Sequence, residues 1–206
     1  MKTKIYNLVI IDESGSMWHI KQEAIDSVNE TIQTIRSAQE KFDNQEHLVT
    51  LVTFNSDVKT VYDSLPVSYV KELTDDSYQP NCSTALYDAM GSSITTLSNK
   101  IKEGDKVLVT VVTDGQENAS VEYSGAAVKA LVDNFKSKGW VFAYIGANHD
   151  VKKVGADLSI SNVMSFEASS AGTKRMSKKL NASRENLYYS IANDDFCAEI
   201  ANEKFF

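Results

Sequence analysis

Cysteine and proline are scarce in this 206-residue sequence, which has two of each, and glycine occurs nine times. Cys82 and Cys197 are too few for a disulfide scaffold or a cysteine-based zinc site, and such sparing use of cysteine is typical of a reducing compartment. No stretch is rich enough in proline, glycine or serine to act as a flexible linker. We therefore expect one folded unit rather than a string of domains.

Excess positive charge and long hydrophobic runs are also missing. The 21 basic residues are outnumbered by 28 acidic ones, so the formal net charge is -7, which argues against a general electrostatic attraction to nucleic acid or anionic lipid. No segment approaches the roughly 18 apolar residues of a membrane-spanning helix. The apolar stretch at residues 5–11 is too short for a signal peptide and has no cleavage site. These absences predict a cytoplasmic protein without a nucleic-acid or membrane partner.

Short apolar runs alternate with amphipathic segments along the chain. Runs rich in β-branched residues predict strands buried on both faces, at residues 5–11, 48–54, 107–112 and 140–145. Apolar residues at helical spacing predict helices at residues 20–42, 86–101 and 123–138, with a shorter helix at 151–158. Residues 58–62 follow a short turn and predict an antiparallel edge strand, and residues 162–166 a weaker last strand. This order predicts a doubly wound α/β fold, with a mostly parallel sheet and helices on both faces.

The last part of the chain, residues 168–206, has a different pattern. Apolar residues recur on one side of a predicted helix, at Met176, Leu180, Leu187 and Ile191, and the basic residues of 174–184 predict a solvated opposite side. We expect this helical segment to pack on a core formed by about residues 4–167. The prediction is thus a single domain over residues 1–206.

Two buried strands of the predicted sheet end in an aspartate-containing turn. Parallel strands present their carboxyl ends at one edge of the sheet, where loops converge and ligands bind. Aspartates and hydroxyls at such places can also be ordinary helix N-caps. The two strand-ending loops are Asp12-Glu13-Ser14-Gly15-Ser16 and Thr113-Asp114-Gly115. A third polar loop, Asn81-Cys82-Ser83-Thr84, opens the helix that leads into the second of these strands.

The aspartates, serines and Thr84 of these loops offer carboxylates and hydroxyls, with no thiolate or imidazole among them. An all-oxygen set selects hard divalent cations, and Mg²⁺ fits best because it takes few protein ligands and keeps waters, although the same oxygens suit Mn²⁺. Neutral hydroxyl ligands leave the charge of the cation poorly compensated. A carboxylate from outside would then be a favourable further ligand, so the predicted site can hold an acidic residue of a partner.

The three loops, with Ala85-Leu86-Tyr87-Asp88-Ala89 after the threonine, closely resemble those of the von Willebrand factor type A domain. The resemblance runs over roughly residues 4–166 and includes the family's metal-ion-dependent adhesion site, with no departure at its five ligand positions. It implies that Ser14, Ser16 and Thr84 are hydroxyl ligands and that Asp12 and Asp114 bind the ion directly or through waters. Many relatives have Gly-Gly before the threonine, where this chain has Asn81-Cys82-Ser83.

The resemblance implies a metal-dependent protein-interaction module that works within a larger assembly and has no catalytic residues. One alternative is a metal-dependent phosphohydrolase in which Asp12 attacks phosphorus, but Ser14 stands where such enzymes carry a second acid. Another is a structural subunit whose metal only stabilises the loops. Beside the site, Trp18 either borders the partner-binding face or packs against the following helix. Glu117 either adds a charge behind the metal or stabilises a helix N-terminus.

Overall fold

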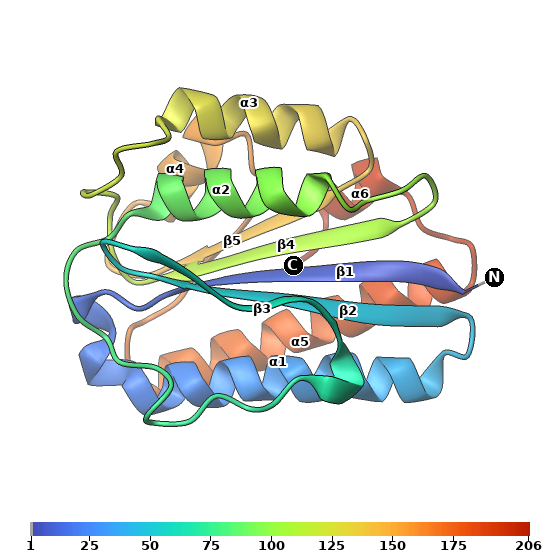
Figure 1. Ribbon diagram of the computed structural model, residues 1–206, viewed down its shortest axis with the longest axis horizontal. Coiled ribbons are helices and arrows are strands. Elements are labelled where there is room, and N and C mark those ends of the chain that lie inside the picture. The colour runs from blue at the N-terminus through green and yellow to red at the C-terminus, as the bar shows by residue number, and fades with distance from the viewer. Residues whose placement is uncertain (1) are drawn as a thin grey trace.

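The computed structural model describes residues 2–206 and contains a six-stranded sheet between two layers of helices (Figure 1). The strands lie in the order β3-β2-β1-β4-β5-β6. All neighbours are parallel except β2 and β3. The doubly wound, mostly parallel sheet with one antiparallel edge strand is therefore confirmed. Its strands are β1 (Thr3–Asp12), β2 (Gln45–Phe54), β3 (Val58–Pro66), β4 (Lys106–Thr113), β5 (Val141–Gly146) and β6 (Asn162–Ser165).

The helices cover both faces of the sheet, as Figure 1 shows. α1 and α5 pack side by side on one face, and α2 and α3 lie on the other. The helical elements are η1 (Gly15–Ile20), α1 (Lys21–Lys41), η2 (Val67–Tyr69), α2 (Leu86–Ser98), α3 (Gly125–Lys136), α4 (Val151–Asp157), α5 (Ser170–Ala192) and α6 (Ala198–Glu203). Among residues 2–206, no helix is long and apolar enough to cross a membrane.

The central strands are apolar on both faces because each face contributes to a separate core. In β1, Ile5 and Ile11 belong to the core shared with α1 and α5. Leu8 and Ile10 point to the opposite side and belong to the core shared with α2 and α3. This alternation follows from the two-residue period of a strand, and it explains why the run has no polar face.

Several element ends differ from the predicted ones. The helix predicted at 123–138 begins at Gly125, because the Ser124 side chain caps it by accepting a hydrogen bond from the Ala127 backbone N–H. Gly139, three residues after the end of this helix, has a positive φ of 86°. A single short helical turn, η2, follows β3, and α2 ends at Ser98 rather than at 101.

The C-terminal segment forms two helices, α5 and α6, separated by a turn in which Asp194 has a φ of 58°. The predicted apolar side of α5 is buried with the α1 core. The prediction for Arg184 was wrong: instead of lying on a solvated face, it is fully buried beneath the sheet. Its guanidinium donates to Thr110 Oγ1 over 2.9 Å and to Asn7 Oδ1 over 3.3 Å. Its burial depends on Thr110 and Asn7, two sheet residues that are 74 and 177 positions away in the sequence. The residue pattern of the helix alone therefore could not predict it.

Candidate metal centre

The two aspartates of the predicted site lie at the carboxyl ends of adjacent strands. β1 ends at Asp12, and Asp114 follows the last residue of β4. The register places Ile11 opposite Val112, so both strands end at the same edge of the sheet, on the left in Figure 1. Both aspartates are buried.

The two serines of the first loop connect these aspartates. The backbone N–H of Ser14 donates to Asp12 Oδ1 over 2.7 Å. The hydroxyls of Ser14 and Ser16 lie 3.2 Å apart, and Ser16 donates to Asp114 Oδ1 over 2.5 Å. Four of the five predicted residues therefore form one continuous polar chain.

Thr84 joins the same group from the start of α2. A methyl group added to Gly115 would lie 3.1 Å from Thr84 Oγ1 and 3.6 Å from both Asp12 Oδ2 and Ser16 Oγ. Oxygens of the first and second loops thus lie around one small region beside Gly115 of the third loop, and Asp114 joins them through its hydrogen bond from Ser16. The structure brings the five predicted residues together.

Backbone hydrogen bonds hold the three loops to one another. The Gly15 N–H donates to the carbonyl oxygen of Cys82 over 3.1 Å, and Asn118 N–H donates to the Thr84 carbonyl over 3.0 Å. Asn118 Oδ1 also accepts from Thr84 N–H. Cys82 has a φ of 61°, a left-handed conformation that favours glycine. The second loop is therefore formed without the Gly-Gly pair of many relatives, with Cys82 in the strained position.

The site is electrostatically unbalanced. Burial raises the pKa of the Asp12 carboxyl to about 6; hydrogen bonds from Thr113 and Ser14 oppose this shift, and the charge of Asp114 adds to it. The Oδ2 atom of Asp114 is buried and has no hydrogen-bond partner among the described residues. An orphaned buried carboxylate oxygen is unfavourable unless something positive approaches it.

These observations fit a small hard cation. Two carboxylates and three hydroxyls converge, and one buried carboxylate oxygen is free. Within residues 2–206, no three or more His, Cys, Asp or Glu side chains are grouped as metal ligands. The predicted set contains only two such residues, since its other members are hydroxyls. Metal ligation by these five residues stays a prediction.

Several residues that shape the site were missed or left open by the sequence analysis. Thr113 Oγ1 donates to Asp12 Oδ2 over 2.5 Å, and the buried Tyr78 hydroxyl donates to the Asp12 carbonyl oxygen. Glu117 accepts from the N–H of Tyr87, in the first turn of α2, over 2.9 Å, which favours the helix N-terminus interpretation. The position of Thr113 next to Asp114 could have indicated its place in the site. Tyr78 could not have been predicted, because it lies in a loop without hydrophobic periodicity or a recognisable motif.

Trp18 borders the site and is 62% exposed, so it does not pack away into the helix that follows. It lies on η1, two residues after Ser16. Lys21 Nζ lies 5.3 Å from the centre of its ring. Val121, in the loop after β4, is 91% exposed. Exposed apolar side chains thus lie on loops that also carry predicted ligands.

Similarity to solved structures is broad in coverage and low in sequence identity. The structure described as von Willebrand factor type A from Catenulispora acidiphila has a TM-score of 0.61 and 13% identity, over 89% of this chain and 43% of that one. The PilB minor pilin from Streptococcus sanguinis has a TM-score of 0.62 and 12% identity, over 95% and 63%. The vWF domain of the type V pili tip protein Mfa5 from Porphyromonas gingivalis has a TM-score of 0.57 and 9% identity, over 88% of this chain and 96% of that one.

At these identities the likeness shows the fold alone, and the chain spans less than two thirds of the first two of these structures. A search of curated protein sequences found no match. The profile of the von Willebrand factor type A domain matches residues 8–173. Since that match covers most of the sequence, the chain belongs to the von Willebrand factor type A domain family.

Proposed function

We propose that this protein is a divalent-metal-dependent interaction module that binds an acidic side chain of a protein partner. Domains of its family are commonly protein-interaction modules. In the proposal, Asp12, Ser14, Ser16, Thr84 and Asp114 hold one Mg²⁺, for which Mn²⁺ can substitute. The bound ion would supply a positive charge that attracts a Glu or Asp carboxylate of the partner.

The observation that carries the proposal is the free Oδ2 atom of Asp114. It is buried and without a hydrogen-bond partner among residues 2–206, while its sister oxygen already accepts from Ser16. A buried carboxylate oxygen left in this state costs about 1–3 kcal/mol or more. A cation at this place would remove that penalty. Because three of the five predicted ligands are neutral hydroxyls, a negatively charged group from a partner would balance the remaining charge.

The surroundings of the site support a protein partner. Trp18 is exposed beside the first loop, and exposed aromatic side chains are frequent anchors in protein interfaces. Two of the similar structures are named as pilus proteins, and a place within a larger assembly is part of the proposal.

The enzymatic alternative has less support. A nucleophilic Asp12 would need a free, accessible carboxylate oxygen. Its side chain is fully buried, Oδ1 accepts from Ser14 N–H, and Oδ2 accepts from the Thr113 hydroxyl. We therefore propose binding rather than catalysis.

The test is affinity capture from a lysate of the source cell in millimolar Mg²⁺, followed by elution with EDTA and mass spectrometry. Asp114→Asn is the control bait, because it removes the charge and keeps the shape of the side chain. We expect proteins that EDTA releases from the wild type and that the control does not retain. Calorimetry should show Mg²⁺ binding to the wild type alone. Mg²⁺ binding without a metal-released protein would favour a purely structural metal, and no Mg²⁺ binding would refute the site.

We propose a cytoplasmic location separately, on different grounds. It rests on the two free cysteines, Cys82 and Cys197, of which Cys82 is exposed. Fractionation of the source cell with an antibody to the chain would test it, and recovery in the extracellular or surface fraction would refute it.

A further inference from the structure

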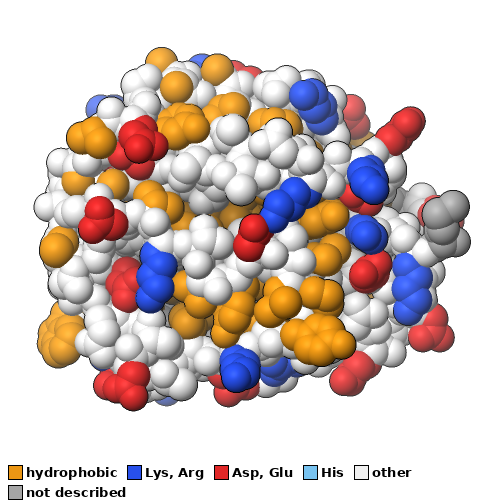
Figure 2. Space-filling model, viewed as in Figure 1, with side chains coloured by type: hydrophobic (Ala, Val, Ile, Leu, Met, Phe, Trp, Pro, Cys, Tyr) orange, Lys and Arg blue, Asp and Glu red, His pale blue; other side chains and the backbone are white. Residues whose placement is uncertain are grey.

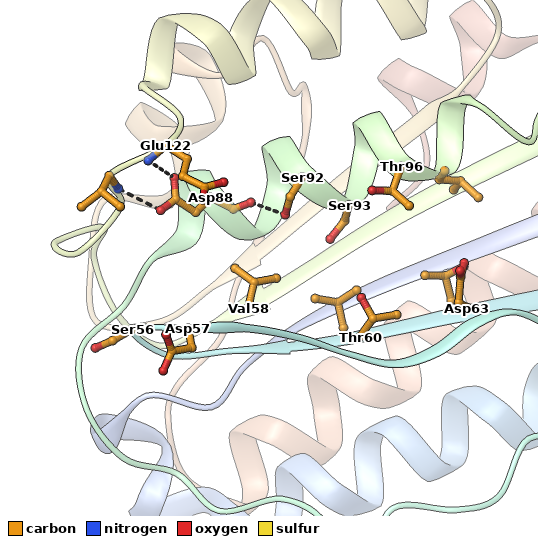
Figure 3. Close-up of a pocket in the computed structure, with 14 residues that line it drawn as sticks. Ser56, Asp57, Val58, Thr60, Asp63, Asp88, Ser92, Ser93, Thr96 and Glu122 are labelled. Atoms are coloured by element: carbon orange, nitrogen blue, oxygen red, sulfur yellow. Dashed lines mark hydrogen bonds between the residues drawn. The ribbon is translucent and has the colours of Figure 1, made fainter.

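A cavity of about 680 Å³ lies between the edge strand β3 and helix α2 (Figure 3). We call it the α2–β3 groove. None of the five predicted metal ligands lines it. Its volume lies within the usual range of ligand sites, about 300–1,000 Å³. Side chains from both elements form its walls, among them Val58, Thr60 and Asp63 from β3 and Ser92, Ser93 and Thr96 from α2.

The groove exists because the two faces of β3 are covered differently. On the α1 side, Val61, Tyr62 and Leu65 pack against the core. On the α2 side, Val58 and Thr60 are exposed and face the groove (Figure 3). Among residues 2–206, no strand pairs with the outer edge of β3. An uncovered strand face and a free strand edge therefore meet in one place.

The charge of the groove has one sign. Of the residues that the structure describes, no Lys, Arg or His lines it, whereas four acidic side chains do. Two of these are already occupied: Asp63 pairs with Lys100, and the Asp88 carboxylate accepts from three backbone N–H groups of the loop before α3. The carboxylates of Asp57 and Glu122 have no ion pair or hydrogen bond among residues 2–206. Both lie at the end of the groove nearest the carboxyl edge of the sheet (Figure 3).

This face of the molecule is shown in Figure 2, where acidic side chains are visible toward the same end. Exposed, unpaired carboxylates beside a cavity attract cations from solution. The charge pattern therefore favours a positively charged occupant.

A second and independent observation comes from Ser93. Its side chain is in the wall of the groove, the residue is only 7% exposed, and its hydroxyl has no hydrogen bond within the described part of the chain. Figure 3 shows this hydroxyl pointing into the space between α2 and β3. Ser93 Oγ is not among the fully buried polar atoms that lack a partner, so it is reached from the groove, where a polar group can hydrogen-bond with it.

We propose that the α2–β3 groove binds an extended basic segment of a protein partner. Its Lys or Arg side chains would reach Asp57 and Glu122, and its polar groups would meet the hydroxyls of Ser93 and Thr60. A divalent ion is the alternative occupant, and the titration described below tests it. A basic side chain needs fewer converging oxygens than a metal ion.

The irregular shape of β3 determines which contacts would contribute most to the affinity for the basic segment. The register of β3 on β2 is irregular between Thr60 and Leu65, and Ser64 has a φ of 53°. Such irregularities discourage strand addition along an edge. The regular part, residues 58–60, can still pair with an extended chain, but it is short. The basic side chains in the groove must therefore supply most of the binding.

The test uses the full chain in EDTA, so that the proposed metal site contributes nothing. The probe is a short fluorescein-labelled peptide of alternating lysine and threonine, and binding is followed by fluorescence anisotropy at two salt concentrations. We expect binding to the wild type that weakens with salt. The double variant Asp57→Asn/Glu122→Gln should bind about five- to tenfold more weakly, as expected for the loss of two exposed ion pairs.

Matched controls separate the groove from general charge. Glu40→Gln/Asp43→Asn removes the same charge at the exposed end of α1 and should bind like the wild type. Ser93→Leu fills the groove without changing the charge and should abolish binding. Thr60→Lys, at an exposed position, repeats that test should Ser93→Leu fail to fold.

Each of the remaining outcomes would overturn the proposal. These are no binding to the wild type, equal weakening by both double variants, or full binding to folded Ser93→Leu or Thr60→Lys. A further outcome is that amide chemical shifts at residues 57–60 and 122 respond to Ca²⁺ or Mg²⁺ but not to the peptide. That result would show that the groove binds a metal ion instead of a basic peptide. Because these measurements contain EDTA except for that last titration, the metal-dependent function can fail without affecting them.

Discussion

Ser16 and Asp114 are 98 residues apart in the sequence, yet the Ser16 hydroxyl donates a hydrogen bond of 2.5 Å to Asp114 Oδ1. This contact completes a polar chain that begins at Asp12 and passes through Ser14. Because Ser16 donates to Oδ1, the other carboxylate oxygen of Asp114, Oδ2, has no hydrogen-bond partner in the described part of the chain. The geometry of one serine thus selects the oxygen that we propose for the cation.

The first prediction concerns Asp114→Asn. In EDTA the variant should be more stable than the wild type by about 1 kcal/mol, because a buried negative charge near Asp12 is removed while an oxygen acceptor for Ser16 remains. In Mg²⁺ the order should reverse, because ligand binding stabilises only the wild type, by about 2.7 kcal/mol when free Mg²⁺ is a hundredfold above its Kd. Thermal unfolding with and without Mg²⁺ measures both effects.

The matched control is Asp76→Asn, which removes one exposed negative charge. It should keep the full stabilisation by Mg²⁺. An Asp114→Asn protein that gains as much stability from Mg²⁺ as the wild type would contradict the assignment of Asp114.

The second prediction is a pH dependence due to His47. This side chain is fully buried, and burial, followed by the charge of Arg184, lowers its pKa to about 4 from an ordinary value of 6.5. Between pH 6.5 and pH 4, His47 binds a proton in the unfolded chain but stays neutral in the folded chain. Stability is therefore complete above pH 6.5 and falls toward pH 4, by up to about 3 kcal/mol. Urea unfolding at a series of pH values measures this loss.

The test compares the wild type with His47→Gln, which should lose this part of the pH dependence. His19→Gln, at an exposed position, should keep it. A comparison is needed because Asp12 acts in the opposite direction: its raised pKa makes the folded state bind a proton first as the pH falls. Parallel pH profiles for His47→Gln and the wild type would show the prediction to be wrong.

The third prediction concerns the left-handed Cys82. Its φ of 61° is unfavourable for a residue with a β-carbon, so Cys82→Gly should raise the free energy of unfolding by about 0.5–1 kcal/mol. Cys82→Ser retains the β-carbon and should have little effect. Chemical denaturation in a reducing buffer provides the measurement. A glycine variant less stable than the serine variant would argue against the strained loop.

The fourth prediction concerns the contact between Gly91 and Tyr123. A β-carbon on Gly91, in the middle of α2, would lie 2.2 Å from Cδ1 of the Tyr123 ring. Gly91→Ala should therefore destabilise the protein by about 1–3 kcal/mol, although alanine is the better helix former by about 1 kcal/mol.

A double-mutant cycle distinguishes the two effects. In a Tyr123→Ala background the ring is gone, and Gly91→Ala should become neutral or stabilising. Urea unfolding of the four proteins gives the coupling energy. The same loss in both backgrounds would mean that the ring is not the cause.

The sheet was predictable because its signals are local. β1 and β4 are uninterrupted apolar runs, and a strand buried on both faces leaves little other choice of sequence. The aspartates that end these runs were predictable as neighbours, since parallel strands share an edge. The resemblance to the von Willebrand factor type A domain then brought in Thr84, which no periodicity would have connected to Asp12.

Other features depend on contacts between distant residues. The burial of Arg184 is decided by Asn7 and Thr110, and the role of Tyr78 by a single bond to the Asp12 carbonyl oxygen. The exact start of α3 depended on the Ser124 cap. The α2–β3 groove was invisible in the sequence, because it arises from the part of β3 that α2 leaves uncovered.

The backbone bonds between the loops have a consequence for how the site is filled. The Gly15–Cys82 and Asn118–Thr84 bonds involve no predicted ligand oxygen. The loops therefore hold their arrangement without help from the ligand side chains, so little conformational entropy is lost when an ion or a partner arrives. Binding at this edge of the sheet should resemble the occupation of a rigid receptor rather than the folding of a flexible loop around its ligand.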